Sequence, residues 1–125
     1  MKKILVVEDD EMMVLTYKSW FESSIKPSSD ILVQFCKDGR EASYLLKMFN
    51  YDMTFLDLAL PNISGPDLVS LYLKNMGRLV VASSYPEASK STCDKAQRVL
   101  TKPFNSSELL SEVETMSKGA NYAKP

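Results

Sequence analysis

The sequence predicts an α/β fold in which helices cover both faces of a five-stranded parallel sheet. Short apolar runs rich in Val, Ile and Leu alternate with longer segments whose apolar residues recur at helical spacing. Strands that alternate with helices pair in parallel through right-handed crossovers. The length of 125 residues suits one domain with its own core, so we expect a single domain over residues 1–125 without linkers or repeats.

The first half of the chain provides three of the five strands. Apolar runs bounded by polar or turn residues are expected as buried strands at residues 4–7, 31–35 and 51–57. Each of the first two runs is followed by apolar residues at helical spacing, which predict the buried face of a helix. These residues are Met13, Tyr17, Trp20 and Phe21 after the first run, and Ala42, Leu45, Leu46 and Phe49 after the second. Residues 23–30 predict a loop, and Asp38-Gly39 predicts a turn.

The second half continues the alternation. Two further strands are expected at residues 79–82 and 98–101. The buried face of the earlier helix is predicted at Leu68, Leu71 and Tyr72, and that of the last helix at Leu109, Val113 and Met116. Pro66 suits the first position of the earlier helix, and Asn105 with Glu108 predicts a capping box on the later one. Residues 85–97 predict only a short or mobile helix. Helix ends are expected at residues 75–77 and at Gly119, with fraying at residues 120–125.

Composition narrows the functional classes. The net charge is −1, from 15 basic and 16 acidic residues. No run of lysine or arginine stands out, so the sequence does not indicate direct contact with nucleic acid. No segment is long enough to span a membrane. The absence of histidine removes histidine-based catalysis, the usual zinc sites and a role as phosphohistidine donor. Cys36 and Cys93 lack metal-ligand spacing and are expected to be reduced thiols in a cytoplasmic protein.

Polar side chains follow four of the predicted strands where these strands end. They are Glu8 and Asp9 after the first strand, Asp57 after the third, Ser83 after the fourth and Lys102 after the fifth. The carboxyl ends of parallel strands share one edge, where open α/β sheets bind ligands, so we expect these groups to converge. Taken singly, each has a structural explanation, because Asp57 could cap a turn and the acidic run could cap a helix.

The whole chain resembles a response-regulator receiver domain. The matching segments are Ile4 to Asp10, Tyr51 to Asp57, Leu60 to Gly65, Val80 to Ser83 and Lys102-Pro103-Phe104. The resemblance implies a flavodoxin-like doubly wound sheet with strand order 2-1-3-4-5, the order of the chemotaxis receiver. It also implies a phosphorylation-controlled switch of a two-component or phosphorelay pathway. Such a switch is not an enzyme, although it assists its own phosphoryl transfer and dephosphorylation.

The resemblance assigns roles in phosphoryl transfer to three residues. Asp57 matches the phosphoacceptor, which attacks a phosphohistidine on a sensor histidine kinase or a phosphotransfer protein. Ser83 matches the switch hydroxyl, and Lys102 matches the lysine that pairs with the phosphoryl group. Phosphoryl transfer depends mainly on positioning and charge neutralisation. The Lys102-Pro103 peptide is expected to be cis, which would aim the lysine inward.

Mg²⁺ is the cofactor that the resemblance implies. Its ligands would be the carboxylates of Asp9 and Asp57 and the backbone carbonyl of Ala59, while Glu8 would act through water. This set agrees with the preference of Mg²⁺ for oxygen ligands and retained waters, and clustered carboxylates repel one another until a cation binds. Asp10 is expected to cap the first helix instead.

Output is implied to depend on protein contacts. The face formed by the fourth helix, the fifth strand and the last helix would bind an output protein or a second copy of the domain. Many receivers carry Tyr or Phe three positions before the lysine, and this ring turns inward when the switch hydroxyl moves. Here that position is Val99, so we expect residues 85–97 to carry the conformational change.

Three other functions are alternatives to the switch. A pseudo-receiver would keep the fold and bind proteins without phosphate, which Val99 and the short fourth helix favour slightly. An aspartate-nucleophile phosphatase would need a second acid two residues after the nucleophile, where Ala59 stands. A flavodoxin would need a phosphate-binding loop after the first strand, where residues 8–10 are all acidic and would repel phosphate.

Overall fold

The predicted sheet and its strand order are confirmed. A computed structural model of the chain describes residues 1–118. Its strands are β1 (Lys2–Val7), β2 (Ile31–Cys36), β3 (Met53–Leu56), β4 (Arg78–Ser83) and β5 (Arg98–Thr101). They form one sheet in the order β2-β1-β3-β4-β5, with every neighbouring pair parallel. All strands therefore end at the same edge, as the sequence predicted.

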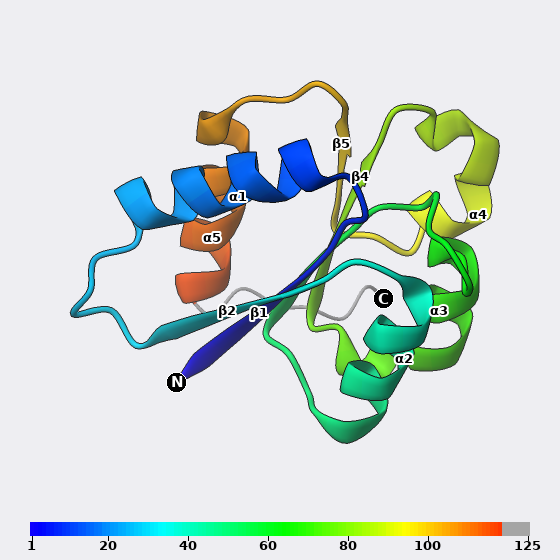
Figure 1. Ribbon diagram of the computed structural model, residues 1–125, viewed down its shortest axis with the longest axis horizontal. Helices are drawn as coiled ribbons and strands as arrows, with labels where there is room; N and C mark the ends of the chain where they lie inside the picture. Colours follow the sequence, from blue (N-terminus) through cyan, green and yellow to red (C-terminus); the bar gives the residue numbers. More distant parts are fainter. Residues whose placement is uncertain (119–125) are drawn as a thin grey trace.

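Helices cover both faces of this sheet (Figure 1). The α-helices are α1 (Glu11–Ser24), α2 (Gly39–Met48), α3 (Gly65–Tyr72), α4 (Lys90–Cys93) and α5 (Ser106–Ser117). Two 3-10 turns, η1 (Leu73–Asn75) and η2 (Pro86–Ser89), precede β4 and α4. Helices α1 and α5 lie on one face, and α2, α3 and α4 lie on the other. The segment before β5 contains only η2 and the single turn α4, which confirms that the fourth helix is short.

The strands are buried on both faces because alternate side chains enter two separate cores. Leu5, Val7 and Leu56 pack with α2 and α3. The second core lies on the opposite face, where Ile4, Val6 and Phe55 pack with α1 and α5. In this second core the Tyr17 ring, fully buried, lies 5.8 Å from the Phe55 ring and 6.1 Å from the Phe104 ring. This packing ties α1 both to β3 and to the segment after β5.

Helix caps mark the helix starts at the edge where the strands end. The side chains of Asp10, Asp38 and Ser64 each accept a hydrogen bond from a backbone N–H in the first turn of α1, α2 and α3. Asn105 and Glu108 form the predicted capping box of α5. At the opposite edge, Gly77 has a φ of 64° just after η1, which confirms the expected helix end there.

The predicted turn at Asp38-Gly39 is the bend between β2 and α2, where the Asp38 side chain caps the helix. Two expectations about the helices were wrong. Phe49 follows the last residue of α2 and is 42% exposed. Leu71 is 64% exposed, and Val69 is buried in its place. Two residues rotate a helix by about 200°, so Val69 and Leu71 face opposite directions.

The remaining expectations concern the thiols, the membrane and the C-terminus. Cys36 and Cys93 are free thiols, as predicted. Among residues 1–118, no helix combines the length and apolar character needed to cross a membrane. The expected helix end at Gly119 and the fraying of residues 120–125 lie outside the described residues.

Candidate functional site

The residues predicted from the strand ends line one open cavity at the carboxyl edge of the sheet. The cavity has a volume of about 570 Å³. Its walls include every candidate side chain, namely Glu8, Asp9, Asp57, Ser83 and Lys102, together with Ala59. Three carboxylates, a hydroxyl and an ammonium therefore converge, as expected from the parallel register of the sheet.

Asp57 lies at the floor of this cavity, directly after β3. Its backbone N–H donates to the carbonyl of Val7 at 3.0 Å, which continues the pairing of β3 with β1. The residue is only 8% exposed. One carboxylate oxygen, Oδ1, accepts a hydrogen bond from the N–H of Ala59 at 3.2 Å. The carboxylate is thereby oriented by the loop that follows it.

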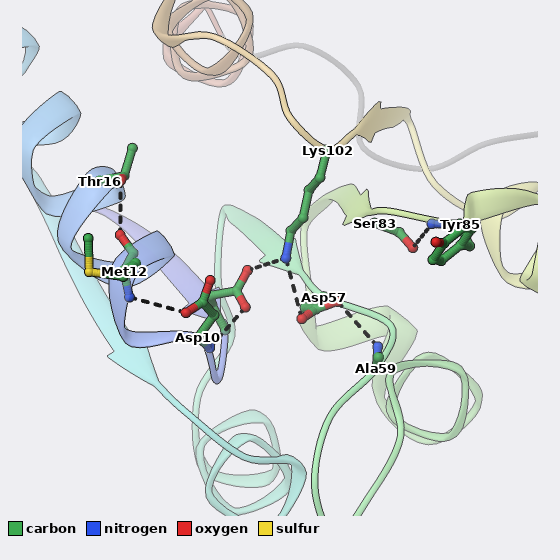
Figure 2. Close-up of polar contacts among 9 residues, drawn as sticks. Asp10, Met12, Thr16, Asp57, Ala59, Ser83, Tyr85 and Lys102 are labelled. Carbon is green, nitrogen blue, oxygen red and sulfur yellow. Dashed lines mark hydrogen bonds and ion pairs between the residues drawn. The ribbon is translucent and has the colours of Figure 1, made fainter.

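Lys102 enters the cavity from the end of β5, between two acidic residues (Figure 2). Its Nζ donates to Glu8 Oε1 at 2.6 Å and lies 3.5 Å from Asp57 Oδ2. Burial lowers the pKa of Lys102, but the hydrogen bond to Glu8 and the charge of Asp57 outweigh burial and raise the pKa overall. The ammonium is therefore charged and held beside the Asp57 carboxylate. The Lys102-Pro103 peptide is cis, as predicted.

The acidic residues of the cavity suit a hard divalent cation. One carboxylate oxygen each from Glu8, Asp9 and Asp57 lies within 4.8 Å of the other two. Glu8 is 1% exposed. Burial raises the pKa of Glu8 to about 7, and the Asp57 charge adds to the rise while Lys102 opposes it. Lys102 brings one positive charge to a cluster of three carboxylates, and oxygen ligands of this kind are those that Mg²⁺ prefers.

Asp10 and Ser83 have backbone partners. Asp10 Oδ1 accepts from the N–H of Met12 at 3.2 Å, so Asp10 caps α1 as expected. Ser83, at the end of β4 and 7% exposed, accepts through its Oγ from the N–H of Tyr85 at 3.1 Å (Figure 2). The Ser83 hydroxyl therefore links the cavity to the first residue of the segment that contains η2 and α4.

Two features of the site did not follow from sequence reasoning. The cavity wall also contains Ala88 and Ser89 from η2. The Tyr85-Pro86 pair could have located this turn, because Pro favours the first helical position. The pairing of Lys102 with Glu8, at a shorter distance than its pairing with Asp57, had no signal in residue spacing.

Val99, three positions before Lys102, is a half-buried aliphatic side chain. Val99 pairs with Val81 across the sheet. Its side chain packs against the core on the α2 and α3 side. A valine in this position has no ring that could turn between surface and interior.

Sequence comparisons match the chain to the receiver domains of response regulators. A profile of the response regulator receiver domain matches residues 4–114. Response regulator ArlR of Staphylococcus saprophyticus is 28% identical over 123 residues, which cover 93% of this chain and 52% of that protein. Probable transcriptional regulatory protein SilR of Salmonella typhimurium is 28% identical over 125 residues, which cover 95% and 52%. The chain spans about half the length of these curated relatives.

Solved structures agree with this result. The receiver domain of a Francisella response regulator superposes with a TM-score of 0.79 at 27% identity, covering 95% of this chain and 98% of that one. Response regulator TrrA of Thermotoga maritima, solved with Mg²⁺ and beryllofluoride, gives 0.76 at 24% identity and covers 93% and 99%; this second likeness concerns the fold alone. By its sequence profile, strand order and converging strand ends, the chain belongs to the response regulator receiver domain family of two-component systems.

Proposed function

We propose that this receiver domain accepts a phosphoryl group on Asp57 from a phosphohistidine of a sensor histidine kinase or a phosphotransfer protein. The observation that carries the proposal is the position of the Asp57 carboxylate. It lies in an open cavity beside the carboxylates of Glu8 and Asp9, and its Oδ2 lies 3.5 Å from the Nζ of Lys102. The three carboxylates could hold a cation, and Lys102, which is also bonded to Glu8, provides a positive charge next to Asp57.

The transfer step uses a carboxylate oxygen of Asp57 as nucleophile. A new P–O bond forms to the phosphorus, and the P–N bond of the phosphohistidine breaks. The electron pair of that bond leaves with the imidazole nitrogen of the donor. Because Oδ1 is held by the Ala59 N–H and Oδ2 lies 3.5 Å from Lys102 Nζ, the ammonium is placed to neutralise charge on the transferred group. Positioning and neutralisation are the main requirements of this reaction.

Mg²⁺ is the proposed cofactor. The carboxylates of Asp9 and Asp57 and the backbone carbonyl of Ala59 would hold it, with Glu8 acting through water. When bound, it would neutralise the excess negative charge of the cavity and of the incoming phosphoryl oxygens. The Mg²⁺ and beryllofluoride complex of the related TrrA supports this assignment by analogy of fold.

Incubation with acetyl phosphate tests the proposed function without knowledge of the kinase. The wild-type chain is expected to gain the mass of one phosphoryl group in the presence of Mg²⁺, and none when the metal is chelated. Intact-mass spectrometry measures the gain. A chain that stays unmodified with Mg²⁺ present would support the phosphate-independent pseudo-receiver instead.

Asp9→Ala is expected to weaken Mg²⁺ binding by tenfold or more, because it removes one of few carboxylate ligands, and loss of outer-shell partners alone costs about 10–100-fold. Titration of Mg²⁺ followed by backbone amide signals gives the dissociation constant. Asp10→Asn is the matched control, since Asn caps a helix about as well as Asp and Asp10 is engaged with Met12. Equal affinities in wild type and Asp9→Ala would exclude Asp9 as a ligand.

For output, we propose that phosphorylation acts on residues 85–97. The Ser83 Oγ accepts from the Tyr85 N–H, so a turn of this hydroxyl toward a phosphoryl group would change the first hydrogen bond of the segment. The segment has little regular structure to resist such a change, since η2 and α4 contain four residues each. It borders β5, and the face of α4, β5 and α5 is the proposed binding surface for an output protein or a second receiver.

Beryllofluoride with Mg²⁺ is expected to slow hydrogen exchange in residues 84–96 of the wild-type protein. In Ser83→Ala this protection should weaken, because the hydroxyl that links the cavity to Tyr85 is gone. Ser91→Ala is the control and should leave the protection unchanged, since Ser91 is exposed and does not line the cavity. Protection confined to the loop after Asp57, or unchanged in Ser83→Ala, would rule out this route and favour the pseudo-receiver.

Residues 1–125 are proposed to act as a single receiver domain, of which the family profile matches residues 4–114. A cytoplasmic location and the absence of direct nucleic-acid contact stay predictions from composition.

A further inference from the structure

We propose that Gly39, the first residue of α2, is a positioning residue for the loop that carries Asp57 and Ala59. This inference rests on the proposed function, because it assigns Gly39 a role in binding Mg²⁺ at the same site. Gly39 does not line the cavity that holds Asp57. Its effect would therefore pass through the backbone of the loop.

The start of α2 touches this loop backbone to backbone. The N–H of Gly39 donates to the carbonyl of Pro61 at 3.0 Å. A Cβ atom added to Gly39 would lie 1.8 Å from the carbonyl oxygen of Ile63 and 2.5 Å from its carbonyl carbon. These neighbours are main-chain atoms, so no side-chain rotation could relieve the overlap. Any residue larger than glycine must push the loop and the helix apart.

Backbone hydrogen bonds hold the loop after β3 in a compact conformation, so a displacement at its tip should move the whole loop. The N–H of Ile63 also donates to the Pro61 carbonyl at 3.0 Å, and Asn62 between them has a φ of 70°. The N–H of Gly65 donates to the carbonyl of Leu58 at 3.0 Å. The tip of the loop is therefore a tight turn, and its base is closed next to Ala59. A shift at the tip would move Ala59 as well.

The helix side of the contact has little freedom to yield. Asp38 Oδ1 accepts from the N–H of Glu41 at 2.8 Å, which fixes the first turn of α2. Ala42, one turn further, is fully buried. The loop must then absorb most of the displacement. Because the Ala59 N–H orients Asp57, and Mg²⁺ demands near-ideal octahedral geometry, a small displacement would misplace two of the proposed ligands together.

Gly39→Ala is the direct test, with the Mg²⁺ dissociation constant as readout. We expect it to rise by about tenfold or more, the range for losing an outer-shell support of a metal site. Amide signals during a Mg²⁺ titration give the value, and thermal unfolding without metal gives the stability of each variant.

Gly77→Ala is the matched control. A Cβ at Gly77 would lie 2.3 Å from the carbonyl oxygen of Tyr51, and the residue has a φ of 64°. The strain is comparable, but it falls just before β4, at the edge of the sheet opposite the cavity. Gly77→Ala should lower the unfolding temperature and leave the Mg²⁺ dissociation constant unchanged. Equal losses of Mg²⁺ affinity in both variants would reduce Gly39 to a general stability role and overturn the inference.

A measurement on the wild-type protein covers the case in which Gly39→Ala does not fold. Saturating Mg²⁺ should slow hydrogen exchange of the Gly39 N–H, which is bonded to the loop. Exchange of the Arg78 N–H, which is bonded to Asp52 at the opposite edge of the sheet, should stay unchanged. If the wild type does not bind Mg²⁺ at all, the proposed function fails. If it binds and neither the Gly39 exchange rate nor the Gly39→Ala affinity changes, only the positioning role fails.

Discussion

Asp57→Asn is expected to abolish phosphorylation by acetyl phosphate. The amide that replaces the carboxylate is a poor nucleophile, and none of the other acids of the cavity is placed like Asp57. Glu8 is paired with Lys102 at 2.6 Å, Asp10 caps α1, and Asp9 is exposed, whereas Asp57 is buried beside Lys102. Intact-mass spectrometry after incubation with Mg²⁺ should show a single unmodified species, so the loss is complete rather than partial.

Asp52→Asn provides the control on the same strand segment. Asp52 precedes β3 at the opposite edge of the sheet, where its Oδ2 accepts from the Lys3 N–H at 2.8 Å. An Asn side chain can accept the same hydrogen bond, so the fold is kept. This variant should gain one phosphoryl group as the wild type does. Uptake of phosphate by Asp57→Asn at the wild-type level would assign the phosphoacceptor to another residue.

Arg78→Met is expected to lower the free energy of unfolding by about 3–5 kcal/mol, the usual cost of breaking a buried ion pair by removing one partner. Arg78 begins β4, and its Nε and Nη2 donate to Glu112 Oε1 in α5 at 3.0 and 2.8 Å. The two side chains are only 13% and 4% exposed. Without the guanidinium, the Glu112 carboxylate stays buried with its charge uncompensated. Urea unfolding measures the loss.

The double variant Arg78→Met/Glu112→Leu should recover most of this stability, because no charge is left buried and apolar replacements of buried pairs are often neutral. Lys90→Met is the exposed counterpart. Lys90 pairs with Asp94 on the surface, with side chains 81% and 63% exposed, so its removal should cost only about 0.3–0.5 kcal/mol. A loss below about 1 kcal/mol in Arg78→Met would mean that water reaches Glu112 and that the pair is not buried in solution.

The sheet could be predicted from the sequence because its strands are buried on both faces. Such strands appear as continuous apolar runs, and residues 98–101 match β5 at both ends. The convergence of Asp57, Ser83 and Lys102 followed from the same logic, since parallel strands bring their carboxyl ends to one edge. These inferences needed only the order of the elements and no knowledge of side-chain contacts.

The errors arose where tertiary contacts decide the outcome. Leu71 fits an apolar spacing, but α3 turns Leu68 and Val69 toward the sheet and leaves Leu71 in solvent. The sequence indicates the bend at Gly39 but not its backbone contact with the loop after β3. The preference of Lys102 for Glu8 depends on distances between ends of different strands. None of these features leaves a pattern in residue spacing.

Borohydride reduction of the phosphorylated protein tests the central claim most directly. An aspartyl phosphate is an acyl phosphate, so hydride reduces its carbonyl to an alcohol and releases phosphate, whereas an unmodified carboxylate does not react. After treatment with acetyl phosphate and Mg²⁺, peptide mass spectrometry should locate the reduced side chain, homoserine, at Asp57 and at no other acid. Reduction at Glu8, Asp9 or Asp10, or an unreduced Asp57 in a protein that carries the phosphoryl mass, would contradict the assignment of Asp57 as the phosphoacceptor.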